Sequence, residues 1–201
     1  MKKTLVIVAL FVVAMLKAQD SNFRLGLTLA PTISFNKQQI KVDDKWKTID
    51  GTGGLGWKGG LLADYNFSGN YNLHSGFLIH SKAFDGDDID MSITTIEIPV
   101  ALKLRTKEVT DNVHITGFFG GTFDLNVAAS MKDASGDEVD AKDLINNFGM
   151  SFMAGAGAEY DLDFGSIGLG LSYHLGFTDV ADSDYVKMIP KHLSIDLVFY
   201  F

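Results

Sequence analysis

The last ten residues of the chain, HLSIDLVFYF at positions 192–201, alternate between polar and apolar side chains. Successive side chains of a β-strand point to opposite faces, so a period of two indicates an extended strand. This stretch therefore predicts a strand with one apolar and one polar face. The apolar face contains Leu193, Ile195, Leu197, Phe199 and Phe201. The other face contains His192, Ser194, Asp196, Val198 and Tyr200, with Val198 as an apolar exception.

The same period of two recurs in seven further segments, and no helical period competes with it over a comparable length. The composition agrees, because 21 Gly and 15 Phe with only 3 Pro suit long strands better than helices. A length of 201 residues suits a single domain. We therefore predict eight strands, at residues 23–30, 55–67, 71–82, 95–105, 113–127, 148–162, 167–177 and 192–201.

The connections between these segments alternate in length. Short turns rich in Gly, Asn and Asp are expected at residues 68–70, 107–112 and 163–166. This alternation is typical of outer-membrane barrels, which have short periplasmic turns and longer extracellular loops. Long polar loops are expected at residues 36–53, 84–91, 130–146 and 178–191.

The polar face carries charges in the middle of the strands, such as Lys58, Asp64 and Glu97. A soluble ligand-binding barrel would turn its apolar face inward, whereas a membrane barrel turns that face to lipid. Paired charges and small residues suit the narrow interior of eight strands, and the apolar face is too large to expose to water. The predicted fold is all-β, an eight-stranded antiparallel transmembrane β-barrel with short periplasmic turns and four longer extracellular loops.

Residues 1–18 predict a secretory signal peptide. Lys2 and Lys3 precede an apolar run of 12 residues from Leu5 to Leu16, which is too short to cross a bilayer as a helix. We place cleavage after Ala18, with a buried N-terminal helix as the alternative. The expected organisation is a signal peptide at 1–18 and an outer-membrane barrel domain at 19–201, located in the outer membrane of a Gram-negative cell.

The terminal Phe201, with Phe199 two positions before it, resembles the signal that the bacterial barrel-assembly machinery reads on a last strand. This resemblance implies that the machinery is a partner during biogenesis. A single terminal aromatic residue also occurs by chance, so the signal gains weight from the signal peptide and the eight segments beside it.

Several motifs resemble the PorT-like outer-membrane β-barrel family of Bacteroidetes-type bacteria. They are TIEIPVALK at 95–103, which matches the family's "EIP…LK" strand, GFFGG at 117–121, GAGAEY at 155–160 and YHLGFT at 173–178. The likeness covers nearly the whole mature chain and implies the barrel fold. The namesake of the family is tied to secretion through the outer membrane, but these residues do not carry that role over.

The composition excludes several classes of function. With no Cys, the chain has no disulfide framework, cysteine nucleophile or Cys-ligated zinc. A net charge of -8 argues against a nucleic-acid partner, which selects basic surfaces. The sequence GTGGLG at 51–56 matches a dinucleotide-binding pattern, but a strand follows it where that site requires a helix.

No catalytic, cofactor or metal site is predicted. All five His fall on the polar face, without local metal-ligand spacing, and His174 and His192 are expected to face each other across one hairpin. An enzyme would need a nucleophile beside these groups, and no such motif is present. Instead we expect a paired interior network that blocks the lumen, formed by Glu97, Lys103, Arg105, Asp124, Glu159 and Asp196.

The first long loop differs from the other loops, which are acidic. Lys37, Lys41, Lys45 and Lys47 surround Trp46, a combination that suits contact with lipid headgroups or with a protein partner. The expected role is structural or interactive, exerted through the extracellular loops. The expected surroundings are outer-membrane lipid and lipopolysaccharide. The alternatives are a narrow pore or a component of a secretion or transport apparatus.

Overall fold

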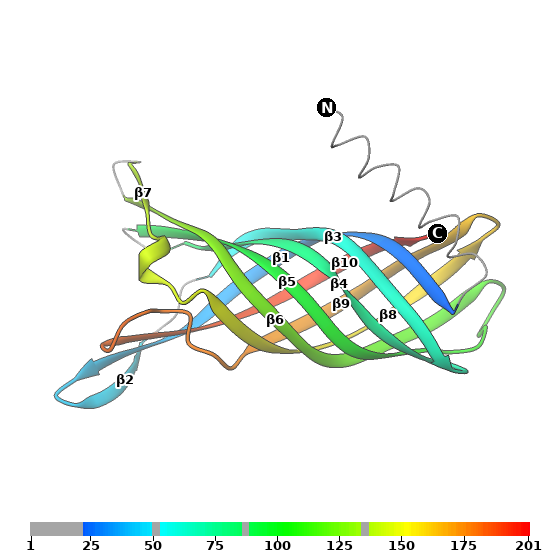
Figure 1. Cartoon of the computed structure of the whole chain (residues 1–201), viewed down its shortest axis with the longest axis horizontal. Coiled ribbons are helices and arrows are strands. Elements are labelled where there is room, and N and C mark those ends of the chain that lie inside the picture. The colour runs from blue at the N-terminus through cyan, green and yellow to red at the C-terminus, as the bar shows by residue number, and fades with distance from the viewer. Residues whose placement is uncertain (1–21, 50–52, 86–88, 134–136) are drawn as a thin grey trace.

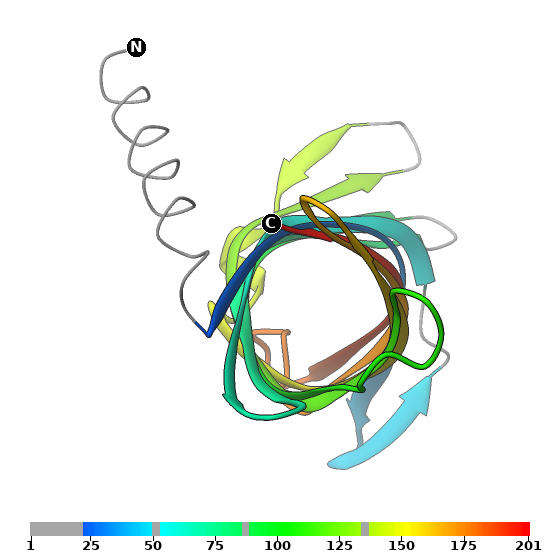
Figure 2. The same cartoon turned by 90° about the vertical axis from the view of Figure 1, so that its right-hand side faces the viewer.

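Eight strands close into an antiparallel ring in the computed structural model (Figures 1 and 2). The structure describes residues 22–49, 53–85, 89–133 and 137–201. The ring consists of β1 (Phe23–Val42), β3 (Gly53–Ser68), β4 (Tyr71–Phe84), β5 (Ile89–Arg105), β6 (Val113–Asp133), β8 (Phe148–Leu162), β9 (Gly165–Gly176) and β10 (Val186–Tyr200). Two short strands, β2 (Lys45–Ile49) and β7 (Glu138–Asp140), and a 3₁₀ turn, η1 (Lys142–Leu144), lie in the long connections.

Pairing between the first and last strands closes the ring. Strand β1 pairs with β3 on one side and with β10 on the other, so that Leu27 lies opposite both Leu61 and Phe199. Closure satisfies the backbone N–H and C=O groups that an open sheet edge would leave bare, which is a requirement in lipid. The C-terminus lies at the end of the barrel with the short turns, which we call the turn end, opposite the loop end (Figure 1).

The strands are longer than the alternation predicted. Strand β1 continues to Val42 and β10 begins at Val186, so two stretches predicted as loops, 36–53 and 178–191, are partly strand. The prediction missed this because polar and apolar residues do not keep to their two faces there: the inward face carries Met188 and Pro190 in β10, and the outward face carries Lys37 and Gln39 in β1. The pairing itself continues, with Gln38 opposite Ile49 and Met188.

The two faces are inverted relative to a water-soluble protein. Leu55 and Phe148, which point outward, are 77% and 75% exposed, whereas Asp64 and Glu97, which point inward, are 0% exposed. A continuous apolar outer surface with charges inside is the arrangement that lipid, not water, stabilises. The predicted eight-stranded barrel is therefore confirmed, with its apolar face outward.

The predicted signal peptide, residues 1–18, lies outside the described residues. In the part of the chain that the structure describes, no helix is both long enough and apolar enough to cross a membrane.

Inward glycines let neighbouring strands approach closely in this narrow ring. A Cβ added at Gly120 would lie 2.3 Å from the Val100 carbonyl oxygen and 2.5 Å from the Ala101 Cα. A Cβ at Gly117 of the same strand would meet only the Gly155 carbonyl oxygen, at 3.7 Å. The glycine-rich face is thus a packing requirement of the curvature.

We expect Gly120→Ala to destabilise the folded barrel by about 1–3 kcal/mol, because backbone atoms of β5 must move to admit the methyl group. Gly117→Ala is the matched control and should stay within about 0.5 kcal/mol of the wild type. Urea unfolding in lipid vesicles measures both. Equal stability of the two variants would contradict the close-packing argument.

Candidate functional site

Charged side chains fill the interior of the barrel. Because one side chain in two points inward along each strand, polar groups from opposite walls meet across a narrow lumen. The buried charged or titratable groups of β3, β4, β5, β6 and β8 are Lys58, Asp64, His74, His80, Lys82, Glu97, Lys103, Asp124 and Glu159.

Lys103 lies at the centre of an ion-pair cluster in the half of the interior nearest the turn end. Its Nζ is 2.7 Å from Asp64 Oδ2 and 2.7 Å from Glu159 Oε1. Glu159 Oε2 accepts hydrogen bonds from Arg105 Nε at 2.8 Å and from Arg24 Nη2 at 2.9 Å. We call these five residues the turn-end cluster. Glu159 is shared between three cations and Asp64 pairs with Lys103, which offsets the cost of removing these charges from water.

A second group, the loop-end cluster, consists of His80, Lys82, Glu97 and Asp124. Lys82 Nζ lies between the two carboxylates, 3.3 Å from Glu97 Oε1 and 3.3 Å from Asp124 Oδ2. His80 Nδ1 is 2.6 Å from Glu97 Oε1. The four residues come from β4, β5 and β6, which are neighbours in the ring.

Lys58 forms a third contact group on the opposite wall. Its Nζ is 3.2 Å from Asp196 Oδ1 and 3.3 Å from His174 Nε2. Because an ammonium group only donates hydrogen bonds, His174 Nε2 accepts here and the His174 proton lies on Nδ1.

A constriction of larger side chains separates the charged groups. Leu62, Leu78 and Tyr200 pack together inside the ring, and the ring of Phe118 stacks on His74 with centroids 5.6 Å apart. The cavity that remains beside them has a volume of about 60 Å³. Side chains of the described residues therefore narrow the interior at this level.

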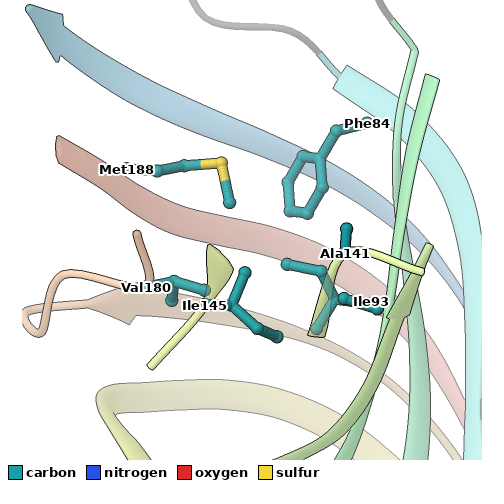
Figure 3. Packing of buried hydrophobic residues seen from close by; sticks show 7 residues of the cluster. Phe84, Ile93, Ala141, Ile145, Val180 and Met188 are labelled. Atoms are coloured by element: carbon teal, nitrogen blue, oxygen red, sulfur yellow. The ribbon is translucent and has the colours of Figure 1, made fainter. Parts of the chain in front are cut away.

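An apolar cap closes the loop end of the interior (Figure 3). Segments of two long connections fold back over the opening and are tied to each other, since Ile145 forms a β-bridge with Ala181. The prediction of long polar loops at 130–146 and 178–191 is therefore wrong in part, because apolar residues inside them are buried at the mouth of the ring. The cap consists of Phe84, Ile93, Ala129, Ala141, Ile145, Val180 and Met188.

The turn end is open and polar. A vestibule of about 410 Å³ is lined there by Arg24, Arg105, Lys107 and His114 together with asparagine side chains. His114 Nε2 lies 3.0 Å from Asp161 Oδ2, and the Arg105 guanidinium lies 2.6 Å from Asp161 Oδ1. The Asp161 carboxylate offsets part of the positive charge of this vestibule. The vestibule is therefore not a site that binds anions through positive charge alone.

The six residues predicted as one interior network divide among three groups. Lys103, Arg105 and Glu159 belong to the turn-end cluster, and Glu97 and Asp124 to the loop-end cluster. Asp196 pairs with Lys58. The prediction named no partner for these groups, although alternation already placed the partners on the same face; they are Arg24, Lys58, Asp64, His80 and Lys82.

The histidines lie where the strand register predicted. His174 and His192 are opposite each other in the β9–β10 pair, and their rings stack with centroids 4.0 Å apart. This confirms that the two face each other across one hairpin. His74 Nδ1 is 2.6 Å from Asp64 Oδ1, whereas His192 Nε2 is buried without a hydrogen-bond partner.

Phe199 and Phe201 lie at the turn end of β10. The two rings are 6.3 Å apart, Phe199 is also 6.1 Å from Phe164, and the Phe201 N–H donates to the Leu25 carbonyl. Their position on the closing strand is compatible with the predicted assembly signal, which stays a prediction.

Comparison with known proteins places the chain among outer-membrane barrels. A family model described as "Outer membrane protein beta-barrel domain" matches residues 17–182. Neisserial surface protein A, NspA, is similar in structure with a TM-score of 0.51 and 12% identity, covering 90% of this chain and 98% of its own. OprG from Pseudomonas aeruginosa gives a TM-score of 0.47 and 13% identity, over 89% and 96% of the two chains.

The protease OmpT from Escherichia coli gives a TM-score of 0.42 and 7% identity, over 89% of this chain and 96% of its own. At these identities the likeness concerns the fold alone. No curated protein matches the sequence.

We expect Glu159→Gln to destabilise the barrel by about 3 kcal/mol, because it removes the carboxylate that three buried or half-buried cations share. Asp44→Asn is the control. Its side chain is 93% exposed and pairs only with Lys41 at the surface, so its loss should cost less than about 1 kcal/mol. Urea unfolding in vesicles compares the two, and similar midpoints would contradict a stabilising turn-end cluster.

Proposed function

Because the chain belongs to the outer membrane protein beta-barrel domain family, we propose that it acts as a structural or interaction protein with a side-chain-filled interior. It is an outer-membrane β-barrel protein, and its specific task is the part that we propose. The observation that carries the proposal is the filled lumen, where the turn-end cluster, the constriction and the apolar cap follow one another along the barrel axis. A barrel without a passage works through its surfaces.

In this proposal the protein is not an enzyme. Catalysis at the outer rim would need histidines or carboxylates that meet substrate there. His80, His174 and His192 are instead buried beneath the apolar cap, and His114 lies at the turn end. The interaction surface is therefore the outer part of the loops and strands.

One part of this surface is basic and faces outward. We define the basic hairpin patch as Lys37, Lys41, Trp46, Lys187 and Lys191. The strand register brings it together, with Lys41 opposite Trp46, and Lys187 Nζ lies 4.3 Å above the Trp46 ring. The patch lies next to the apolar outer face of β1 and β10, on the side of the loop end. Lipid headgroups are expected at that level of an outer-membrane barrel.

We propose that the basic hairpin patch contacts the phosphate groups of lipopolysaccharide in the outer leaflet. Lysine ammonium groups bind phosphate as point charges, and tryptophan favours the boundary between acyl chains and headgroups. The whole chain carries a net charge of -8. The positive charge of this patch is therefore a local feature that the overall composition does not explain.

The proposed biogenesis follows the sequence signals. Export would use the signal peptide at 1–18, leaving the barrel domain at 19–201, and the assembly machinery would read Phe201 and Phe199 on the last strand. The alternative class is a narrow pore or a component of a secretion apparatus. The resemblance to PorT-like proteins does not carry the namesake's role over to this chain.

Conductance separates the closed barrel from the pore. We expect the purified, refolded protein to give no stable single-channel steps in a planar bilayer, because side chains fill the lumen at several levels. A refolded wide-lumen porin under the same conditions is the control for insertion. Stable steps of one reproducible size would instead assign the protein to the transport class.

Charge reversal tests the basic hairpin patch. We expect Lys37→Glu combined with Lys41→Glu to reduce the lipopolysaccharide that co-purifies with the barrel at least threefold, because like charges then face the phosphates. Lys107→Glu, at the opposite end of the barrel, is the matched control and should leave the amount unchanged. Phosphate analysis of the detergent-purified protein measures the lipid. Equal losses in both variants would refute a specific contact.

A further inference from the structure

Three strands bring a possible metal-ligand set together inside the loop-end half of the barrel. His80 comes from β4, Glu97 from β5 and His192 from β10, and all three are at least 97% buried. One ligand atom from each residue lies within 4.8 Å of the other two. We propose that His80, Glu97 and His192 bind a divalent transition-metal ion, with Zn²⁺ as the representative.

The chemistry of the donor set favours this class of ion. Two imidazoles and one carboxylate form a known zinc-ligand combination, and imidazole suits Zn²⁺ and its neighbours in the transition series. Calcium and magnesium prefer a shell made of oxygen alone, which this cluster does not offer. A small ligand such as water would complete a four-coordinate shell.

The geometry requires only a small adjustment. A metal ion at the centre of a triangle with sides of 4.8 Å would lie about 2.8 Å from each corner. The usual bonds are about 2.1 Å, so each donor atom would move inward by about 0.7 Å. Rotation of side chains achieves such shifts without movement of the strands.

Two buried donor atoms in this cluster have no other use in the structure. Glu97 Oε2 and His192 Nε2 are both buried and have no hydrogen-bond partner. Buried polar atoms are nearly always satisfied by protein groups, water or a ligand, and these two lie in one cluster, where a single ion could bind both. They are an observation independent of the proximity of the three residues.

The contact between His80 and Glu97 marks the position that the metal ion would occupy. His80 Nδ1 lies 2.6 Å from Glu97 Oε1, a distance at which one proton joins the two groups. Metal ions compete with protons for imidazole nitrogen. When the ion binds His80 Nδ1, the proton of the neutral imidazole moves to Nε2, which lies 3.3 Å from Thr32 Oγ1. The ion would then hold together the same groups that the proton joins.

Neighbouring side chains hold His192 in position. Its ring packs edge-on to His80 with centroids 4.4 Å apart and stacks on His174 at 4.0 Å. His174 is itself oriented by Lys58, whose Nζ is 3.3 Å from its Nε2. The imidazole of His192 is therefore directed by contacts on both sides, as ligands in metal sites commonly are.

Two lysines near the site would repel a metal cation, but three carboxylates lie in the same layer of the barrel. Lys82 lies between Glu97 and Asp124, and Lys58 pairs with Asp196. Three carboxylates against two ammonium groups leave one negative charge in this layer before a metal ion enters. With neutral histidines, a divalent ion whose bound water loses one proton would bring this layer to a net charge of zero.

The test uses the whole mature chain without a histidine tag, refolded in detergent with Zn²⁺ present and then washed with a chelator. Loading during refolding matters because the apolar cap covers the site. We expect about one zinc per folded barrel by mass spectrometry of the metal. The variants His192→Asn and Glu97→Gln should each weaken binding at least about tenfold.

His114→Asn is the matched control, because His114 lies at the turn end and bonds to Asp161 and the Thr106 carbonyl. It should retain the zinc content of the wild type, and metal bound by the acidic loops would remain in every variant. Heat-dependent migration in gels shows which variants are folded. If only one of the two site variants folds, its zinc content is compared with that of the wild type. If neither folds, the visible spectrum of the Co²⁺-loaded wild type tests the site instead.

A tetrahedral Co²⁺ spectrum with nitrogen ligands would support the site. Folded wild-type protein that holds no zinc after loading would overturn the proposal. So would equal zinc contents in the wild type and the folded site variants. Neither result bears on the closed lumen, since conductance tests that independently.

Discussion

The constraint on which the structure depends is charge compensation in a narrow, closed ring. Eight strands leave an interior that side chains fill, so an ionised group pointing inward has little water to solvate it. Asp64, Glu97 and Glu159 are each in contact with at least one basic or imidazole group for this reason. Their pairing holds together strands that are far apart in sequence.

Closure of the ring also determines the environment of the outer face and of the two ends of the barrel. Lipid accepts the apolar outer face, and backbone pairing between β1 and β10 removes the open edges. At the loop end, β2 and β7 extend the sheet past the ring (Figure 1). The cap residues of the loops fold inward, so in our proposal the outer surface of these extensions is the part that partners would contact.

Much of the fold could be predicted because alternation reports directly on the two environments of a barrel wall. It located the eight strands and the inward face, and it placed His174 opposite His192. It failed in residues 36–42 of β1 and 186–191 of β10, where polar and apolar residues do not keep to the two faces that they occupy in the rest of the wall. The apolar cap was missed because Ile145 and Val180 lie in irregular loops without a period.

The sequence by itself determined the barrel and which residues face inward, since the side-chain period of a strand is a local property of the chain. Only the tertiary structure decided which inward residues meet. Lys103 bonds to Glu159, and His80 approaches His192, because ring closure and strand stagger bring distant walls to the same height. Those partners depend on the whole circumference of the barrel, and no local pattern of residues contains that information.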